Sequence, residues 1–360
     1  MSPARERSRR WAALAVLLLV AAFAVVAGER LRPAAGPTAE PPPAAADQVV
    51  HTKARRLVVR PTAEDTARSV ATFRALDEHP LYAMTYHGPA ATVAVEPDPS
   101  PRSRPQRRAF ACTVFAAAGD PAAPLLGRNF DWDHNPALVL HSQPRGGYRS
   151  VALVDLSYLG VERAALDAGD PTALAGLMQA VALPFDGMNE HGLAIGMAAV
   201  DEAVPELRPG RPAVGGIGVM RLVLDHARTV TEAVDVLGSY NLDFAGGPGL
   251  HYLIADATGA STVVEFVAGR MVTVPRVAAN SWQVMENFHL AGAADPLSHT
   301  RWSTADSTLR QAAGAPGVPA ALDLLRQVAQ AHTQWSAVFH LATRETVLRT
   351  TRGTHTLPAP

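Results

Sequence analysis

The chain is poor in cysteine, with Cys112 as the single example in 360 residues. A lone thiol cannot form an internal disulfide, and it cannot build a metal site from thiolates by itself. Two uses remain: a small apolar core residue, since free cysteine is among the most buried residue types, or a nucleophile. Cys112 taken alone favours the core role, and the residues that follow it reverse that balance.

Lysine is equally scarce, because Lys53 is the only lysine among the 32 basic residues. It precedes the expected folded part, so Schiff-base and serine–lysine chemistry are excluded there. The net charge of −1 provides no field that favours nucleic acid, and we expect no nucleic-acid partner. The sequence has no Gly-rich phosphate loop and no HExxH motif, and His289, His299 and His332 lack ligand spacing. We therefore expect no metal and no cofactor.

The first 28 residues read as a targeting element. Four arginines lie within the first ten residues, and an uninterrupted apolar run of 18 residues follows from Trp11 to Gly28. This run is long for a signal-peptide core and short for a spanning helix, so residues 1–28 are predicted to be a signal peptide or a membrane anchor. Since the arginines precede the run, we expect an exported protein that is secreted or anchored to the membrane, outside the cytoplasm.

Three further segments follow from composition. Residues 29–61 form a Pro/Ala-rich linker, residues 62–111 precede the cysteine, and residues 112–360 hold the remaining pattern. Within the middle segment, helical spacing predicts a helix over 62–76, and 80–86 reads as a strand. The polar, proline-rich stretch 97–108 is a solvated loop that ends just before Ala111 and Cys112, where a peptide bond can be reached and cut.

Beyond Cys112, strands and helices occur in separate runs. Strands are predicted at 150–156, 193–200, 250–256, 261–267, 270–275, 335–341 and 346–350. Helices are predicted at 218–227, 231–237 and 320–331, with Thr229 and Glu232 forming a capping box. Grouped hairpin strands with separate helices favour antiparallel sheets covered by helices over a parallel doubly wound fold.

Arg128 and Asp131 follow Cys112 by 16 and 19 residues, in the run GRNFDW. A thiol, a guanidinium and a carboxylate together can hold a thiolate and steer a proton. The competing interpretation of Arg128 and Asp131 is an ordinary salt bridge.

Taken with the motif DGMNEHGL at 186–193, this pattern resembles the N-terminal-nucleophile cysteine amidases, the choloylglycine hydrolase and penicillin V acylase family of linear amide C–N hydrolases. Matching pieces continue in family order at 251–256, 264–266, 280–287, 299–302 and 333–338. The strand PLYAMTY before the cysteine is similar to that of acid-ceramidase-like and N-acylethanolamine-amidase-like members. The resemblance spans about Leu81 to Thr350.

The resemblance implies an α+β fold, a four-layer αββα sandwich of two packed antiparallel sheets between helices, with the catalytic domain at 112–360. It also implies autocatalytic cleavage of the Ala111–Cys112 bond. The freed α-amine of Cys112, with a reference pKa near 8, would then serve as the base for its own thiol. Residues 62–111 would be a propeptide or a retained small subunit.

The resemblance also implies roles for further residues. Arg128 would favour the thiolate, Asp131 would hold the α-amine, and Arg301 would complete the charge pattern. Asn189 would stabilise the oxyanion, although asparagine is common in turns such as its own. Asn287 would be a second polar contact; Asn280 competes with it, and Glu286 stands where the family has threonine.

The sequence thus predicts an amidase that hydrolyses a small-molecule linear amide with an apolar acyl group through a thioester on Cys112. Two alternatives stay open: an acyltransferase that uses the same acyl-enzyme, and a non-catalytic, surface-anchored binding protein on the same fold. A homo-oligomer is compatible with all three.

Overall fold

The computed structural model describes residues 55–95, 111–245, 247–293 and 295–360. Every described residue belongs to one compact unit, which spans 52–360. The predicted signal peptide or anchor, most of the linker and the loop at 97–108 lie outside the described residues. Within the part of the chain that is described, no helix is both long enough and apolar enough to cross a membrane.

The larger of two packed sheets has nine strands. Its order is β15 (Arg270–Pro275), β14 (Ser261–Val267), β13 (Leu250–Ala255), β10 (Ala194–Ala199), β9 (Asp186–Asn189), β8 (Ser150–Asp155), β7 (Ala137–Arg145), β3 (Leu81–Pro89) and β2 (Arg74–Asp77). All its pairings are antiparallel except that of β3 with β7, which is parallel. The expectation of purely antiparallel sheets is therefore wrong at this pairing, and a small separate sheet is also parallel.

The second sheet has six strands and carries the cysteine. Its order is β16 (Trp282–Met285), β5 (Ala111–Ala117), β6 (Leu125–Asp131), β17 (Thr333–His340), β18 (Thr346–Arg349) and β19 (Thr354–Leu357). Two small two-stranded sheets pair β1 (Arg55–Val58) with β4 (Thr92–Val95), and β11 (Ala213–Gly215) with β12 (Asn241–Asp243).

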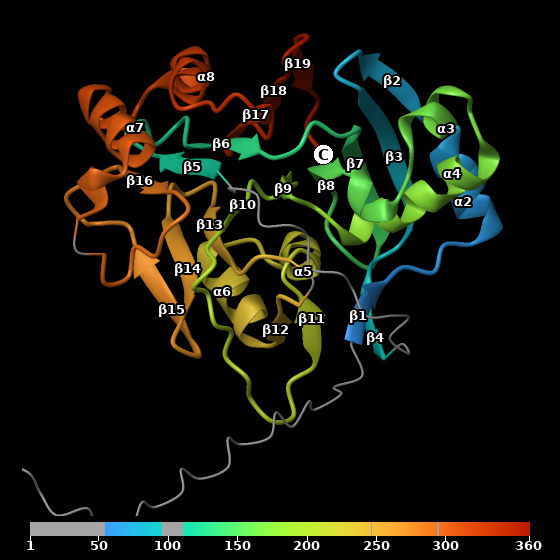
Figure 1. Cartoon of the computed structure of the whole chain (residues 1–360), viewed down its shortest axis with the longest axis horizontal. Helices are drawn as coiled ribbons and strands as arrows, with labels where there is room; N and C mark the ends of the chain where they lie inside the picture. The colour runs from blue at the N-terminus through green and yellow to red at the C-terminus, as the bar shows by residue number, and fades with distance from the viewer. Residues whose placement is uncertain (1–54, 96–110, 246, 294) are drawn as a thin grey trace, which may run out of the picture. The chain divides into compact units, whose positions relative to one another are not determined.

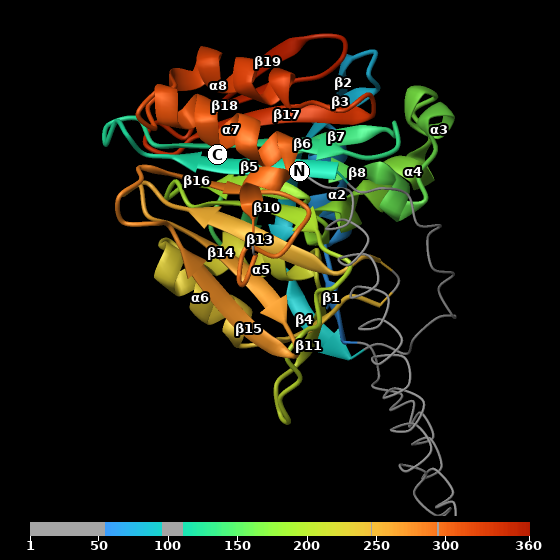
Figure 2. The ribbon, with the colours of Figure 1, turned by 60° about the vertical axis from the view of Figure 1, so that its left-hand side comes forward.

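Helices cover the outer faces of both sheets, so the described unit has four layers (Figures 1 and 2). The six-stranded sheet is covered by α7 (Thr300–Gln311) and α8 (Gly317–Gln327). The nine-stranded sheet is covered by α5 (Gly218–His226) and α6 (Val230–Gly238). Around its β3 end lie α2 (Ala63–Val70), η1 (Leu156–Leu159), α3 (Arg163–Asp167), α4 (Pro171–Gly176) and η2 (Leu177–Ala182), while η3 (Pro296–Ser298) precedes α7. The predicted αββα sandwich is confirmed.

Alternation along β5 separates two apolar cores. Cys112 and Val114 belong to the core between the sheets, whereas Phe115 packs with Leu309 of α7 and Leu325 of α8. Every residue of β5 is buried because both faces of the strand are covered. The cysteine side chain is consequently directed toward the nine-stranded sheet.

All eight predicted strands coincide with observed strands, but the other eleven of the 19 described strands, including β5 and β6, were not predicted. The helices differ as well, since α3, α4 and α7 were not predicted. The predicted helix over 62–76 is wrong beyond Val70: Thr62 caps α2, but the chain then enters β2, which pairs with β3. Helix α7 was not predicted because only Ala305, Asp306 and Leu309 are buried along its length, so its apolar period is weak. The Thr229 cap is present, and the Glu232 carboxylate accepts from the N–H of Arg228, one residue earlier than a capping box requires.

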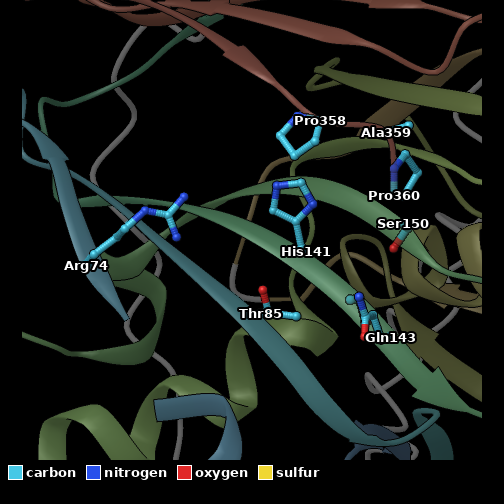
Figure 3. Close-up of a pocket in the computed structure, with 9 residues that line it drawn as sticks. Arg74, Thr85, His141, Gln143, Ser150, Pro358, Ala359 and Pro360 are labelled. Carbon is cyan, nitrogen blue, oxygen red and sulfur yellow. The ribbon is translucent and has the colours of Figure 1, made fainter. Parts of the chain in front are cut away.

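A pocket of about 220 Å³ lies where β3 and β7 meet the C-terminal segment (Figure 3). Thr85, His141 and Gln143 line it from the two strands, and Pro358 to Pro360 cover it. None of the predicted site residues is among the residues that line it. The candidate chemistry therefore lies elsewhere, between the sheets.

Strand β3 belongs to the segment before the cysteine, yet it lies inside the nine-stranded sheet between β2 and β7. Its Leu81, Tyr82, Met84 and Tyr86 are almost fully buried. Burial of each such side chain contributes about 1.5–3 kcal/mol, and the sum is comparable with the net stability of a whole domain.

We therefore predict that a chain starting at Cys112 does not fold when it is produced alone. Loss of β3 would uncover the apolar faces of β7 and leave β7 as an unpaired edge. Circular dichroism and thermal unfolding of the 112–360 chain, with and without a co-produced 52–111 segment, measure this. A soluble 112–360 chain with a cooperative unfolding transition would contradict the prediction.

Candidate active site

Cys112 lies near one end of β5, beside Arg128 on the neighbouring strand β6. Arg128 is paired with Val114, two residues after Cys112 on β5. Cys112 and Arg128 are therefore diagonal neighbours on the inward face of the sheet. The Arg128 Nη2 atom is 3.6 Å from the Cys112 Sγ atom. The cysteine is 5% exposed and Arg128 is fully buried. The two predicted residues are thus brought together in a dry environment.

Arg128 is held by groups from the opposite sheet. Its Nη1 atom lies 3.1 Å from Asp186 Oδ2 and donates to the carbonyl of Phe185 at 2.6 Å. Trp335 Nε1 donates to the same carboxylate at 2.9 Å. Burial raises the pKa of Asp186, while Arg128 and Trp335 act against that rise. The guanidinium is therefore locked with one edge toward Asp186 and the other toward the thiol.

Asp131 is the second predicted residue on β6, and one of its oxygens is unpaired. Its Oδ1 atom accepts from the Thr333 hydroxyl. Its Oδ2 atom is buried without a hydrogen-bond partner, and the nearest cation is Arg301 at 3.8 Å. Burial raises the pKa of Asp131 to about 6, against the Thr333 hydrogen bond and the two arginines. Ala111 is paired with Asp131 in the register, so this carboxylate lies next to the predicted cleavage bond.

Asn287 and Arg301 hold the backbone of Cys112. The Cys112 N–H donates to Asn287 Oδ1 at 2.5 Å, and Arg301 Nη1 donates to the Cys112 carbonyl at 2.9 Å. Arg301 Nη2 also donates to Asn287 Oδ1 at 3.2 Å. The competing Asn280 lies in a turn after β15, where its carbonyl accepts from Arg276. Asn287 is therefore the asparagine that reaches the cysteine.

The side-chain amide of Asn189, which the sequence assigned to the oxyanion together with nearby backbone N–H groups, has other partners in the structure. Its Nδ2 atom donates to the carbonyls of Leu224 and Ala227, and its Oδ1 atom accepts from the N–H groups of His191 and Leu193. Asn189 shares a face of β9 with Gly187, where an added Cβ would meet Leu224 of α5. That is the outer face of the sheet, away from Cys112. All four hydrogen-bonding capacities of the amide are spent on joining the turn to α5.

The thiol itself experiences opposing effects. Burial raises the pKa of Cys112 and outweighs the lowering by Arg128 and Arg301, while the Asp131 carboxylate adds to the rise. Burial also raises the pKa of Tyr158 to about 12, with Cys112 among the lesser causes. Tyr158 is 41% exposed and packs its ring against Phe185. It therefore marks a side of the site that solvent reaches.

Four contributors carried no role in the sequence interpretation: Asp186, Thr333, Tyr158 and Glu286. Asp186 and Thr333 each open a stretch that matches the family pattern, which was the available signal. Glu286 was noticed only as a departure, and it forms an ion pair with Arg301. Tyr158 carries no motif. Within the described residues, no group of three histidine, cysteine, aspartate or glutamate side chains is arranged to hold a metal ion.

Residues 112–291, half of the chain, match the model of the linear amide C–N hydrolases, choloylglycine hydrolase family. The chain belongs to this family. The match begins at Cys112 itself, and amide hydrolysis is accordingly the general activity of the protein. No curated protein sequence matches the chain.

Solved structures of three amide hydrolases are similar to the chain. A mutant of conjugated bile acid hydrolase from Clostridium perfringens is 15% identical with a TM-score of 0.50, covering 69% of this chain and 92% of its own. Penicillin V acylase from Agrobacterium tumefaciens is 18% identical (TM-score 0.49, 69% and 86% covered). The Caenorhabditis elegans ortholog of N-acylethanolamine-hydrolyzing acid amidase is 16% identical (TM-score 0.45, 64% and 93% covered). At this identity the bile acid hydrolase shows a shared fold.

The buried Asp131 carboxylate predicts a pH-dependent stability of the uncut chain. Because its folded pKa of about 6 exceeds the ordinary 3.8, the folded state binds more protons than the unfolded state between these values. Stability is then fully present below about pH 4 and is lost as the pH rises through about 6, by about 3 kcal/mol at most. In a Cys112→Ala background, Asp131→Asn should remove this loss, so the variant gains relative stability as the pH rises. Denaturant unfolding at several pH values measures it; a difference that stays constant with pH would contradict it.

The two asparagines provide a matched pair. Asn189→Ala should lower the free energy of unfolding by about 2–4 kcal/mol, because two buried carbonyls lose their donor, with kcat/KM on an amide little changed. Asn287→Leu should lower kcat/KM about 100-fold or more. Thermal unfolding and steady-state kinetics separate the two effects. An inactive but stable Asn189→Ala protein would restore the discarded role.

Proposed function

We propose that the protein hydrolyses linear non-peptide amides through a thioester on Cys112, after the Ala111–Cys112 bond has cleaved itself. One observation carries the proposal: the thiol lies 3.6 Å from a buried guanidinium, while Asn287 and Arg301 hold the N–H and carbonyl of the same residue. A structural cysteine in an apolar core needs none of these polar groups, whose burial costs free energy.

Cleavage starts with attack of Cys112 Sγ on the carbonyl carbon of Ala111. The C–N bond breaks, the nitrogen becomes an amine, and the Ala111 acyl group passes to sulfur as a thioester. Water then hydrolyses the thioester and leaves a carboxylate on Ala111 and a free thiol. The Asn287 carboxamide oxygen already accepts from the nitrogen that becomes the amine, which supports this sequence of steps.

The freed α-amine acquires hydrogens that the peptide nitrogen lacked, and Asp131 Oδ2 is a buried acceptor without a hydrogen-bond donor, 3.8 Å from Arg301. In the proposal this carboxylate orients the amine, which takes the thiol proton and later donates it to the leaving amine. Arg128 favours the thiolate. Asn287 presents its carboxamide oxygen to the Cys112 nitrogen, and its Nδ2 atom donates to the Ala199 carbonyl at 2.8 Å, so in the proposal it helps Asp131 to hold the α-amine.

An apolar acyl group is the substrate feature that the surroundings favour. Tyr158 packs on Phe185 with ring centroids 4.9 Å apart, and Phe185 contacts Phe130 at 5.2 Å. These rings border the arginine that faces the thiol. Of these rings, Tyr158 is the one with exposed apolar surface, at 41% exposure, on which an aliphatic or aromatic acyl chain can pack. N-acyl amides with long or aromatic acyl groups are therefore the proposed class.

Export and a retained pre-nucleophile segment complete the proposal. Arginines followed by an apolar run support export of the chain. The position of β3 inside the nine-stranded sheet supports retention of residues 62–111 as a small subunit, because its release would expose buried side chains.

The decisive prediction is a fragment that begins at Cys112. Intact-mass spectrometry of the purified protein should show two pieces divided at the 111–112 bond, and Cys112→Ala should stay a single chain with no amidase activity. Arg128→Met, which keeps the side-chain volume without the charge, should lower kcat/KM at least 100-fold. An uncut wild type that hydrolyses amides would overturn the mechanism.

The substrate class is tested with the cut protein and a panel of amides: penicillin V, bile-salt conjugates, N-acyl homoserine lactones, N-acylethanolamines and ceramide. Release of carboxylic acid from apolar acyl amides supports the proposal. Transfer of the acyl group to an added amine, with little free acid, would identify an acyltransferase instead. Full retention of ligand binding after thiol alkylation, with no turnover of any amide, would identify a binding protein.

A further inference from the structure

Glu286 occupies the position where the family has threonine, and its carboxylate is almost completely buried beside the site. One oxygen forms a close ion pair with Arg301 Nη2, and the other accepts from the N–H of Trp302 at 3.1 Å. Its side chain is 8% exposed. Both contacts are made to the first turn of α7, directly after β16 has ended.

The contact to Trp302 supplies a cap that α7 otherwise lacks. His299, the N-cap residue, makes no side-chain hydrogen bond to the helix. A carboxylate at a helix N-terminus satisfies a free N–H and interacts favourably with the helix dipole. Glu286 therefore fixes the start of the helix and the guanidinium of Arg301 together, and the guanidinium in turn reaches Cys112, Thr113 and Asn287.

Glu286 also adds a negative charge to the site. Two cations and three carboxylates lie within one or two contacts of Cys112: Arg128, Arg301, Asp131, Asp186 and Glu286. With a threonine at position 286, the two arginines would face two carboxylates, so the numbers of positive and negative groups would be equal. The extra carboxylate offsets the charge of Arg301, which disfavours the thiolate and favours a protonated α-amine.

Resting on the proposed function, we propose that Glu286 is the positioning residue for Arg301 and raises the pH range in which Cys112 acts. The groups that face the thiol are Arg128 and Asp131 from β6, Arg301 from α7 and Tyr158 from η1. The groups that face Glu286 are Arg301 and, at its backbone, His251 from β13, with Glu265 and His289 behind that histidine.

Two substitutions separate the effect of the Glu286 charge from the effect of its side-chain length. Glu286→Gln keeps the length and the acceptor but removes the charge, so the acid limb of kcat/KM should move down by about 0.5–1 pH unit at an effective dielectric constant of about 20. Glu286→Asp keeps the charge but cannot bridge Arg301 and Trp302. It should lower kcat about tenfold and leave the limb in place.

Asp306 of α7 supplies the matched control for Glu286. Its carboxylate pairs with Arg310 at 2.5 Å and accepts from Trp282 Nε1 at 2.8 Å, outside the contacts of Cys112. Asp306→Asn also removes one buried negative charge, and it weakens the contact between α7 and Trp282 of β16. It should lower thermal stability and leave the pH profile unchanged.

A second readout does not require amide turnover. Because the chain has one cysteine, the ultraviolet absorbance of the thiolate, taken as a difference from Cys112→Ser, titrates this thiol alone. The midpoint pH of this titration should be lower in Glu286→Gln than in the wild type and unchanged in Asp306→Asn. If Glu286→Gln does not fold, Glu286→Thr, which restores the family residue, makes the same comparison.

A Glu286→Gln titration that coincides with wild type, or an equal shift with Asp306→Asn, would overturn the inference. If the thiol titration shifts in Glu286→Gln but the wild-type protein hydrolyses none of the amides, the role of Glu286 is supported and the proposed function is rejected. If the wild-type protein hydrolyses amides but the Glu286→Gln titration does not shift, the proposed function is supported and the role of Glu286 is rejected.

Discussion

The buried guanidinium of Arg128 is the interaction on which the rest of the site depends. A cation without exposure carries a desolvation cost that only close partners offset, and here the partners come from the opposite sheet: Asp186 at 3.1 Å and the Phe185 carbonyl at 2.6 Å. Because Arg128 belongs to the six-stranded sheet and Asp186 to the nine-stranded sheet, this ion pair fixes their packing at one point. The thiol lies on the remaining side of that guanidinium. Substitution of Asp186 would accordingly change the surroundings of the Cys112 thiol, although Asp186 acts on the thiol only through Arg128.

The sequence predicted what depends on short-range pattern. Strands such as β14 and β15 have alternating or continuous apolar residues between turn residues, and their predicted limits agree with the structure. The offsets of Arg128 and Asp131 from Cys112 are likewise local, because two neighbouring antiparallel strands convert a fixed spacing into a fixed contact. Helix α7 escaped detection because it buries few residues. Arg301 lies in its first turn and reaches Cys112 from there, a placement that needs no strong apolar face.

What could not be predicted depends on partners far away in the chain. Asn189 and Asn287 both stand in turn-like contexts that match the family, and only their distant partners distinguish them. Asn189 bonds to Leu224 and Ala227 on the outer face, whereas Asn287 bonds to Cys112, 175 residues before it. Glu286 poses the same problem, because its partners Arg301 and the N–H of Trp302 lie on a helix that begins 14 residues later in the chain.

The uncut chain already holds the site in an assembled and unsatisfied form. Asp131 has a buried oxygen with no donor, and the nitrogen next to it carries one hydrogen, which is directed to Asn287. A buried carboxylate with too few hydrogen-bond donors is unfavourable, and burial makes this one keep its proton to a higher pH than usual. Cleavage at Cys112 would create an ammonium group beside Asp131, because Ala111 and Asp131 are register partners. The new charge pair would lower the pKa of the carboxylate and stabilise the cut form, so the geometry that makes the nucleophile would also favour the bond cleavage that releases it.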